Sequence, residues 1–314
     1  MSRWFLGVDG GQSSTSALIG NESGRVAGVG YAGPCNHVSG AESQARFRDA
    51  IGGAIRSALA AAGLTEVRFE AACLGLSGGP ADKEVLIHEL VPAEHYRVTN
   101  DAVIALLGAT AGEPGVIAIA GTGSIAYGRN AEGRTARAGG WGYVFGDEGG
   151  AFDLVRQAVR AALRHEEGWG HSTALREALL EATGAPTVND LLHRFYTPEY
   201  PRARIAAYAT LVDEAARNGD AAARDILHTA AQALATFVAA VRRQLFHRGE
   251  LARTSYIGGV FLNEILRERF AMLVQLESDA PVHPPALGPA AGALIEAYRL
   301  AGLRVHPSNA PPGV

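Results

Sequence analysis

The chain has 314 residues, of which 47% are hydrophobic and 19% charged, and its formal net charge is −4 at pH 7. This composition suits a globular protein with one large or two medium cores, and it excludes a disordered or fibrous chain. Because lysine and arginine form no cluster, the sequence offers no electrostatic footprint for a nucleic-acid partner.

The sequence favours a cytoplasmic protein without a membrane partner. Its two cysteines, Cys35 and Cys73, form neither a disulfide framework nor a Cys-x-x-Cys metal pair, and we expect Cys73 to be buried and reduced. An apolar strand begins at Trp4, which leaves no room for a signal peptide. No uncharged apolar stretch reaches the roughly 18 residues that a membrane helix needs.

The first part of the chain predicts a mixed sheet covered by helices. A helix is expected from about Ala41 to Ala62, because apolar residues such as Phe47, Ile51 and Ile55 recur every four residues on one face. The other predicted elements are strands at 4–9, 14–20, 25–30, 71–76 and 95–99, and helices at 81–90 and from Asp101.

The following segment repeats the pattern of the N-terminal strands. An apolar run at 115–120 leads through Gly121-Thr122-Gly123 into predicted strands at 124–128 and 134–138. Two turns of the same form, Asn21-Glu-Ser-Gly-Arg25 and Asn130-Ala-Glu-Gly-Arg134, precede the last strand of each set, about 110 residues apart. This coincidence in the same structural position predicts a duplicated unit.

The remainder of the chain is predicted to be mainly helical. Gly288-Pro289 is a good start signal for its last helix. The predicted elements are helices at 150–166, 220–247, from Asn263 and at 288–301, and a short strand at 255–257.

Two glycine-rich turns could hold phosphate groups. In Asp9-Gly10-Gly11-Gln12-Ser13-Ser14-Thr15, two glycines let several N–H groups converge, and Asp9 could hold Mg²⁺ through water. A tight hairpin in which Asp9 caps its own turn explains this segment equally well. The equivalent turn Gly121-Thr122-Gly123-Ser124 favours phosphate binding, because two such turns could hold the two ends of one triphosphate. The sequence has no P-loop, protein-kinase or GxGxxG dinucleotide motif.

Longer motifs resemble a known family. DGGQSST at 9–15, GTGSIAYG at 121–128 and IGGVFLN at 257–263 resemble the phosphate and adenosine motifs of the actin/hexokinase/Hsp70 superfamily. GPCNH at 33–37, Asn100-Asp101 and GGWGYVFGDEGGAF at 139–152 resemble those of the N-acetylglucosamine kinase and BadF/BadG/BcrA ATPase group. The resemblance covers most of the chain, but the group often has Ser or Thr near the position of Cys35.

This resemblance implies an α/β fold of two duplicated ribonuclease-H-like domains with mixed sheets, the actin-like ATPase fold, flanking a nucleotide and sugar cleft. The N-terminal domain would comprise residues 1–113 and the returning helix 288–301, and the larger C-terminal domain residues 114–287. The implied cofactors are ATP and Mg²⁺, the latter bound through water by Asp9. The implied ATP-binding residues are Gly10, Gly11, Gln12, Ser13, Thr15, Thr122, Gly123, Gly258 and Gly259.

Asp101 is the candidate catalytic base, since phosphoryl transfer to a sugar needs a carboxylate that accepts the hydroxyl proton. An ordinary helix cap is the alternative for Asp101, and the resemblance favours the base. Trp141 could pack under its loop, and Asp147 and Glu148 could pair with a helix dipole. His37 is interpreted as an ordinary loop histidine. The implied sugar-binding residues are Asn36, Ser77, Gly78, Asn100, Asp101, Gly140, Trp141 and Asp147.

The resemblance implies an enzyme, a homodimer that transfers phosphate from ATP to the 6-hydroxyl of N-acetylglucosamine. Glucosamine or another amino sugar is the nearest alternative substrate. A BadF-type activator ATPase would hold an iron–sulfur cluster with cysteines, an arrangement that Cys35 and Cys73 lack. A non-enzymatic sugar sensor would carry an added DNA-binding helix-turn-helix, whereas this chain begins directly with the phosphate strand.

Overall fold

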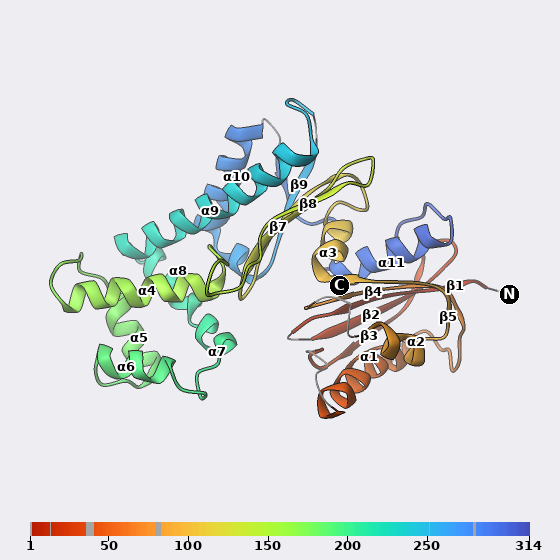
Figure 1. Cartoon of the computed structure of the whole chain (residues 1–314), viewed down its shortest axis with the longest axis horizontal. Coiled ribbons are helices and arrows are strands. Elements are labelled where there is room, and N and C mark those ends of the chain that lie inside the picture. The colour runs from red at the N-terminus through yellow and green to blue at the C-terminus, as the bar shows by residue number, and fades with distance from the viewer. Residues whose placement is uncertain (1, 13, 36–40, 79–82, 251, 279–280) are drawn as a thin grey trace. The chain divides into compact units, whose positions relative to one another are not determined.

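A computed structural model describes the chain except for residues 1, 13, 36–40, 79–82, 251 and 279–280 (Figure 1). The chain divides into two compact units. Unit 1 comprises Met1–Gly115 and Pro284–Val314, and unit 2 comprises Val116–His283. In the described part of the chain, no helix is both long and apolar enough to span a membrane.

Unit 1 is built on a mixed sheet in the order β3-β2-β1-β4-β5. Its strands are β1 (Trp4–Gly10), β2 (Thr15–Asn21), β3 (Val26–Ala32), β4 (Phe69–Leu76) and β5 (Ala93–Asn100). Its helices are α1 (Ala41–Ala61), α2 (Glu84–Leu90), α3 (Asp101–Ala109) and α11 (Pro289–Leu300). Short turns make β1, β2 and β3 antiparallel, whereas helical connections make β4 parallel to both β1 and β5.

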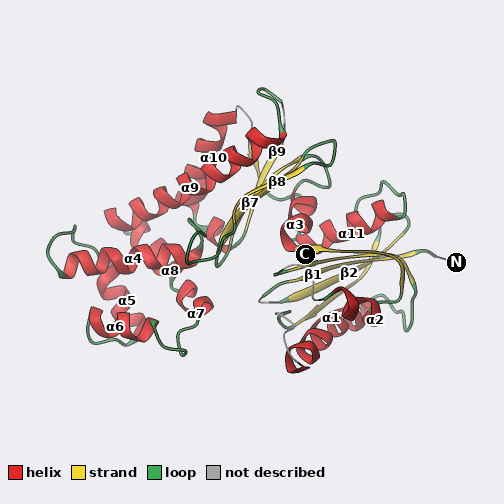
Figure 2. Cartoon of the chain, in the orientation of Figure 1, coloured by secondary structure: helices red, strands yellow, loops and turns green. Residues whose placement is uncertain are grey.

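Alternating side chains of this sheet enter two separate cores. Leu6 and Val8 of β1 join residues of α1 and α2 in one core, whereas Phe5 joins α3 and α11 in the other. Successive strand residues point to opposite faces, so a strand that is apolar on both faces needs helices on both sides. Figure 2 shows these helices on either side of the sheet. The central strands are therefore rigidly held, and their ends can position a site.

Unit 2 has a sheet in the order β10-β9-β6-β7-β8 and a larger set of helices. Its strands are β6 (Gly115–Ala120), β7 (Ser124–Arg129), β8 (Thr135–Gly139), β9 (Arg253–Ile257) and β10 (Val282–His283). Its α-helices are α4 (Ala151–Glu166), α5 (Leu175–Thr183), α6 (Val188–Phe195), α7 (Arg202–Ala207), α8 (Ala209–Arg217), α9 (Ala221–Leu245) and α10 (Glu264–Ser278). A 3₁₀ helix, η1 (Gly259–Leu262), follows β9.

The two sheets have the same strand order when β1–β5 are matched with β6–β10. The repeated turns also match in detail. The N–H of Asn21 donates to the Arg25 carbonyl at 3.0 Å, and the N–H of Asn130 donates to the Arg134 carbonyl at 3.0 Å. In each turn the asparagine Oδ1 accepts from the arginine N–H, at 3.1 Å and 2.9 Å respectively. This agreement supports the predicted duplication.

The predicted long helices are confirmed to within a few residues by α1, α4 and α9. The helix expected from Asn263 begins at Glu264, because Asn263 is its cap and accepts a 2.8 Å hydrogen bond from the Leu266 N–H. The helical region after α4 divides into the short helices α5 to α8, whose separate limits the sequence analysis did not predict.

Candidate active site

Three neighbouring strands of unit 1 end at one edge of its sheet. The parallel register aligns Gly10 of β1 with Leu76 of β4, and Leu76 with Asn100 of β5. Asp9, Ser77 and Asp101 stand at or just beyond these carboxyl ends. In open α/β sheets ligands bind at the carboxyl ends of parallel strands, so this edge is a candidate site.

Asp101 is oriented by Ser77. The Ser77 hydroxyl donates a 2.7 Å hydrogen bond to Oδ2 of Asp101. The helix cap is the preceding residue, since Oδ1 of Asn100 accepts from the Val103 N–H at 3.1 Å. Asp101 is thus the first residue of α3 but does not cap it, and its carboxylate is available for other chemistry.

Asp9 lies close enough to Asp101 for the two charges to interact. Burial raises the pKa of Asp9 to about 7, and the negative charge of Asp101 contributes to this rise. Two carboxylates with different environments share this edge of the sheet. A carboxylate with a raised pKa beside a second carboxylate is typical of a functional site.

Lys83 is a cation at this site that the sequence analysis missed. It is fully buried, and its Nζ donates to the Ser77 carbonyl at 2.9 Å. Burial raises the pKa of the Cys35 thiol to about 11, while the charge of Lys83 lowers it and that of Asp9 raises it. Cys35 lies beside the first glycine-rich turn, since a Cβ atom at Gly10 would be 3.2 Å from its Sγ.

Hydrogen bonds within unit 1 hold the first glycine-rich turn in place. The Gly11 N–H donates to the Ser14 carbonyl at 3.0 Å, and the Gly11 carbonyl accepts from the Cys35 N–H at 2.9 Å. The Thr15 hydroxyl is buried and donates to the Gly33 carbonyl at 2.9 Å, so this donor is already used within the protein.

Other predicted residues of unit 1 are placed as follows. Gly10 is buried and Gln12 is exposed. Gly78 has a φ of 76° directly after Ser77, a left-handed conformation that favours glycine. Ser13, Asn36 and His37 lie outside the described residues.

The second glycine-rich turn caps a helix with its carbonyls. The N–H groups of Ala151 and Phe152, at the start of α4, donate to the carbonyls of Gly121 and Thr122 at 2.8 and 3.1 Å. Among the described residues, no acceptor is found for the N–H groups of Thr122 and Gly123. These two amides can therefore serve a phosphate oxygen.

Asp147 lies against this turn and is buried in a left-handed conformation, with a φ of 63°. Its Oδ1 accepts from the Ser124 N–H at 3.4 Å, and its Oδ2 forms an ion pair with Nη2 of Arg202. A Cβ atom at Gly123 would lie 2.6 Å from Cγ of Asp147 and 2.7 Å from Nη2 of Arg202. Only glycine therefore lets this ion pair lie over the turn.

Arg202, at the start of α7, was not predicted from the sequence. Its Cζ lies 5.2 Å from the ring centroid of Tyr143 and 5.9 Å from that of Phe152. Its Nε is buried without a hydrogen-bond partner among the described residues. The guanidinium thus contacts residues of the 139–152 loop and connects α7 with the turn. These contacts join residues far apart in the sequence, and no local sequence pattern indicates them.

The other predicted residues of unit 2 lie around the same turn. The N–H of Gly140 donates to the Ser124 carbonyl at 2.9 Å. Trp141 is 66% exposed, and Cζ of Arg137 lies 4.7 Å from its ring centroid, so it does not pack beneath its loop. Glu148 is exposed, and its carbonyl accepts from the Ser124 hydroxyl at 2.6 Å.

Gly258 and Gly259 lie close to the start of the second turn. Gly258 has a φ of 112°, and a Cβ atom there would lie 2.6 Å from the Ala120 carbonyl carbon. Gly259 has open space beside its α-carbon. This glycine pair therefore combines close packing against β6 with an open surface, which suits an adenosine-binding turn.

The carboxylates of unit 1 suit a hydrated magnesium ion. Among the described residues, no group of three or more His, Cys, Asp and Glu side chains could hold a metal by itself. The repulsion between Asp9 and Asp101, which contributes to the raised pKa of Asp9, would be relieved by a divalent cation. Mg²⁺ keeps several waters and shares phosphate ligands, so one or two carboxylates are enough.

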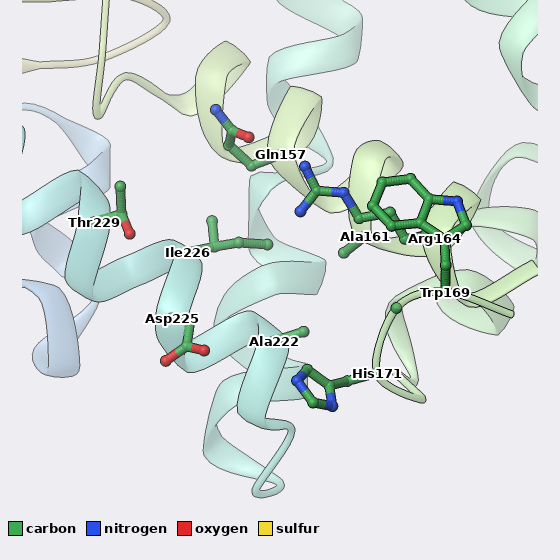
Figure 3. A pocket seen from close by; sticks show the side chains of 10 residues that line it. Gln157, Ala161, Arg164, Trp169, His171, Ala222, Asp225, Ile226 and Thr229 are labelled. Carbon is green, nitrogen blue, oxygen red and sulfur yellow. The ribbon is translucent and has the colours of Figure 1, made fainter. Parts of the chain in front are cut away.

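A separate cavity of about 390 Å³ lies among the helices of unit 2 (Figure 3). Arg164, Trp169, His171 and Asp225 are among the described residues that line it, and Cζ of Arg164 lies 5.1 Å from the Trp169 ring centroid. The residues that line this cavity do not include any of the predicted site residues, so it is distinct from the candidate site.

Several sugar kinases are similar to this chain. The chain is 32% identical to an N-acetylmuramic acid/N-acetylglucosamine kinase of Clostridium acetobutylicum, over 83% of this chain and 86% of the relative. It is 31% identical to an N-acetyl-D-glucosamine kinase of Dictyostelium discoideum, over 81% and 84%. A crystal structure from Chromobacterium violaceum, assigned as an N-acetylglucosamine kinase, matches with a TM-score of 0.77 and 26% identity, over 93% of this chain and 98% of that one.

The family itself follows from a match over most of the sequence. Residues 6–297 match the BadF/BadG/BcrA/BcrD ATPase family. The two sheets of the same strand order, with helices around them, are the actin-like ATPase architecture expected from the sequence. The chain therefore belongs to the BadF/BadG/BcrA/BcrD ATPase family and has its actin-like ATPase fold.

Proposed function

We propose that this chain is an ATP-dependent kinase that phosphorylates the 6-hydroxyl of an amino sugar, with N-acetylglucosamine as its substrate. The observation that carries the proposal is the Asp101 carboxylate, which Ser77 orients with a 2.7 Å hydrogen bond while Asn100 caps the helix. The similarity to kinases of N-acetylglucosamine and N-acetylmuramic acid supports the substrate class.

Asp101 accepts the proton of the sugar hydroxyl in this mechanism. The hydroxyl oxygen forms a bond to the γ-phosphorus of ATP as the bond from that phosphorus to the β–γ bridging oxygen breaks. The products are a sugar 6-phosphate and ADP, and the proton leaves Asp101 for solvent. ATP supplies the phosphoryl group, and a bound Mg²⁺ would neutralise the phosphate charge.

The remaining residues of the site bind and orient in this proposal. The turn at Gly10 to Gln12 and the backbone N–H groups of Thr122 and Gly123 bind phosphate oxygens, and Asp9 would hold Mg²⁺ through water. Gly258 and Gly259 bind the adenosine. Asn36, Gly140, Trp141 and Asp147 contact the sugar, Trp141 through its exposed indole ring.

The test is ADP release from the purified chain with ATP, Mg²⁺ and a panel of sugars. N-acetylglucosamine, N-acetylmuramic acid, glucosamine and glucose are compared by kcat/KM, and NMR identifies the phosphorylated carbon. We expect N-acetylglucosamine to have the highest kcat/KM and to give the 6-phosphate. ADP release that is independent of every sugar would contradict the proposal and favour an ATPase. Higher kcat/KM with N-acetylmuramic acid or glucosamine would change the substrate and keep the reaction.

We also propose that the enzyme is a cytoplasmic homodimer. Sedimentation equilibrium of the full chain tests the assembly, because a monomer and a dimer of a 32.7 kDa chain differ twofold in mass. A single monomeric species at all concentrations would contradict it.

A further inference from the structure

Lys83 is the only lysine of the sequence, although lysine and arginine together number 28. All the other residues in this count are arginines. The one lysine is also fully buried, whereas lysine is among the residues that are least often buried. Composition and position together single out Lys83 for closer attention.

The buried ammonium group contacts the element that orients the proposed base. Its Nζ donates a 2.9 Å hydrogen bond to the Ser77 carbonyl, and the Ser77 hydroxyl donates to Asp101 at 2.7 Å. The Ser77 N–H in turn donates to the Gly10 carbonyl at 3.0 Å. Ser77 is therefore held on three sides, by the phosphate turn, by Lys83 and by Asp101.

The chemistry of the contact explains the choice of lysine. An ammonium group is a compact point charge on a slim stem, whereas a guanidinium is planar and broader. The fully buried position of Lys83, with its Nζ 2.9 Å from the Ser77 carbonyl, favours the compact group. The positive charge also lies at an edge of the sheet that carries two carboxylates, Asp9 and Asp101.

We infer that Lys83 is a positioning residue for the phosphoryl-transfer reaction, which fixes the Ser77 peptide so that the Ser77 hydroxyl holds Asp101 towards the sugar hydroxyl. This inference rests on the proposed kinase function. Lys83 acts through Ser77 and does not itself touch the reacting atoms. Its role is kinetic, so its removal changes turnover and leaves the fold and ATP binding intact.

The experiment is a double-mutant cycle on kcat with Lys83→Met, Ser77→Ala and the double variant. We expect Lys83→Met alone to lower kcat about 10- to 100-fold, the range for a lost hydrogen bond from a charged donor. If Lys83 acts through Ser77, Lys83→Met has little further effect in the Ser77→Ala background. Fluorescent ATP-analogue binding is measured in parallel and is expected to be unchanged.

Arg242→Met is the matched control. Arg242 is a buried cation of unit 2 that donates to the Ala252 and Glu250 carbonyls at 3.1 and 3.2 Å. Its loss should lower the melting temperature and leave kcat unchanged, the reverse of the pattern expected for Lys83→Met.

Three results would overturn the inference. The first is an unchanged kcat in Lys83→Met. The second is an equal effect of Lys83→Met on kcat in the wild-type and Ser77→Ala backgrounds. The third is a Lys83→Met chain that does not fold. The last result would show that the lysine serves stability. A wild-type chain that phosphorylates no sugar would instead refute the proposed function, so the two failures are distinguishable.

Discussion

The Ser77 hydroxyl donates a 2.7 Å hydrogen bond to Oδ2 of Asp101, from the end of one parallel strand to the end of its neighbour. Asp101 opens α3 but leaves the capping of that helix to Asn100. The carboxylate thus has a fixed orientation that does not come from its own helix.

Ser77→Ala should lower kcat about 10- to 100-fold, the range for removing one hydrogen bond to a charged group. The fold should be unaffected, because the Ser77 backbone contacts remain. Steady-state kinetics and a thermal melt check both statements. Ser255→Ala is the control, since its hydroxyl donates to the His283 carbonyl at 2.9 Å in unit 2, and a similar fall in kcat there would argue against a specific role for Ser77.

Asp9→Asn should stabilise the chain at neutral and alkaline pH in the absence of Mg²⁺. Burial, with the charge of Asp101, raises the pKa of Asp9 from 3.8 to about 7. Between these values the folded chain keeps a proton that the unfolded chain has lost, so the stability due to this group falls as the pH rises towards 7. One pKa unit corresponds to about 1.36 kcal/mol, so the gain in the free energy of unfolding has an upper limit of about 4 kcal/mol.

Urea denaturation of wild type and Asp9→Asn at pH 4 and pH 8 measures this difference. The free energy of unfolding of Asp9→Asn should exceed that of the wild type by more at pH 8 than at pH 4. An equal difference between the two proteins at both pH values would show that Asp9 has an ordinary pKa in the folded chain.

Arg202→Met should weaken ATP binding about tenfold. The guanidinium holds the buried Asp147 against the turn at Gly123, and its loss leaves that carboxylate without its cation beside the proposed phosphate site. Titration with a fluorescent ATP analogue measures the affinity without any sugar. Arg164→Met provides the control, because Arg164 also stacks on an aromatic ring of unit 2, at 5.1 Å, but lines the separate cavity (Figure 3). Similar affinities of the two variants would exclude a particular role for Arg202.

Local sequence patterns predicted much of the fold. Period-four apolar residues predicted α1, and the two Asn-x-x-Gly-Arg turns predicted a duplication that the matching strand orders support. These features are readable because each depends on residues that are close together in the chain. The division of the region between α4 and α9 into short helices depends on packing within unit 2, and periodicity alone did not reveal it.

The candidate site shows the same contrast. Asp9, Asp101 and the glycine-rich turns follow strands, so their positions could be predicted. Arg202 reaches the turn from 55 residues beyond Asp147, and no pattern connects the two. Lys83 can be noticed in the sequence because it is the only lysine. Its role became apparent only from its burial beside Ser77.

The kcat of Asp101→Asn is the decisive measurement of whether Asp101 is the base. Asparagine keeps the shape of the side chain but cannot accept the hydroxyl proton, so kcat with N-acetylglucosamine should fall about 10²- to 10⁴-fold. The affinity for an ATP analogue should stay at the wild-type value, because the nucleotide is bound by other residues. Wild-type kcat in Asp101→Asn would contradict the assignment of Asp101 as the base.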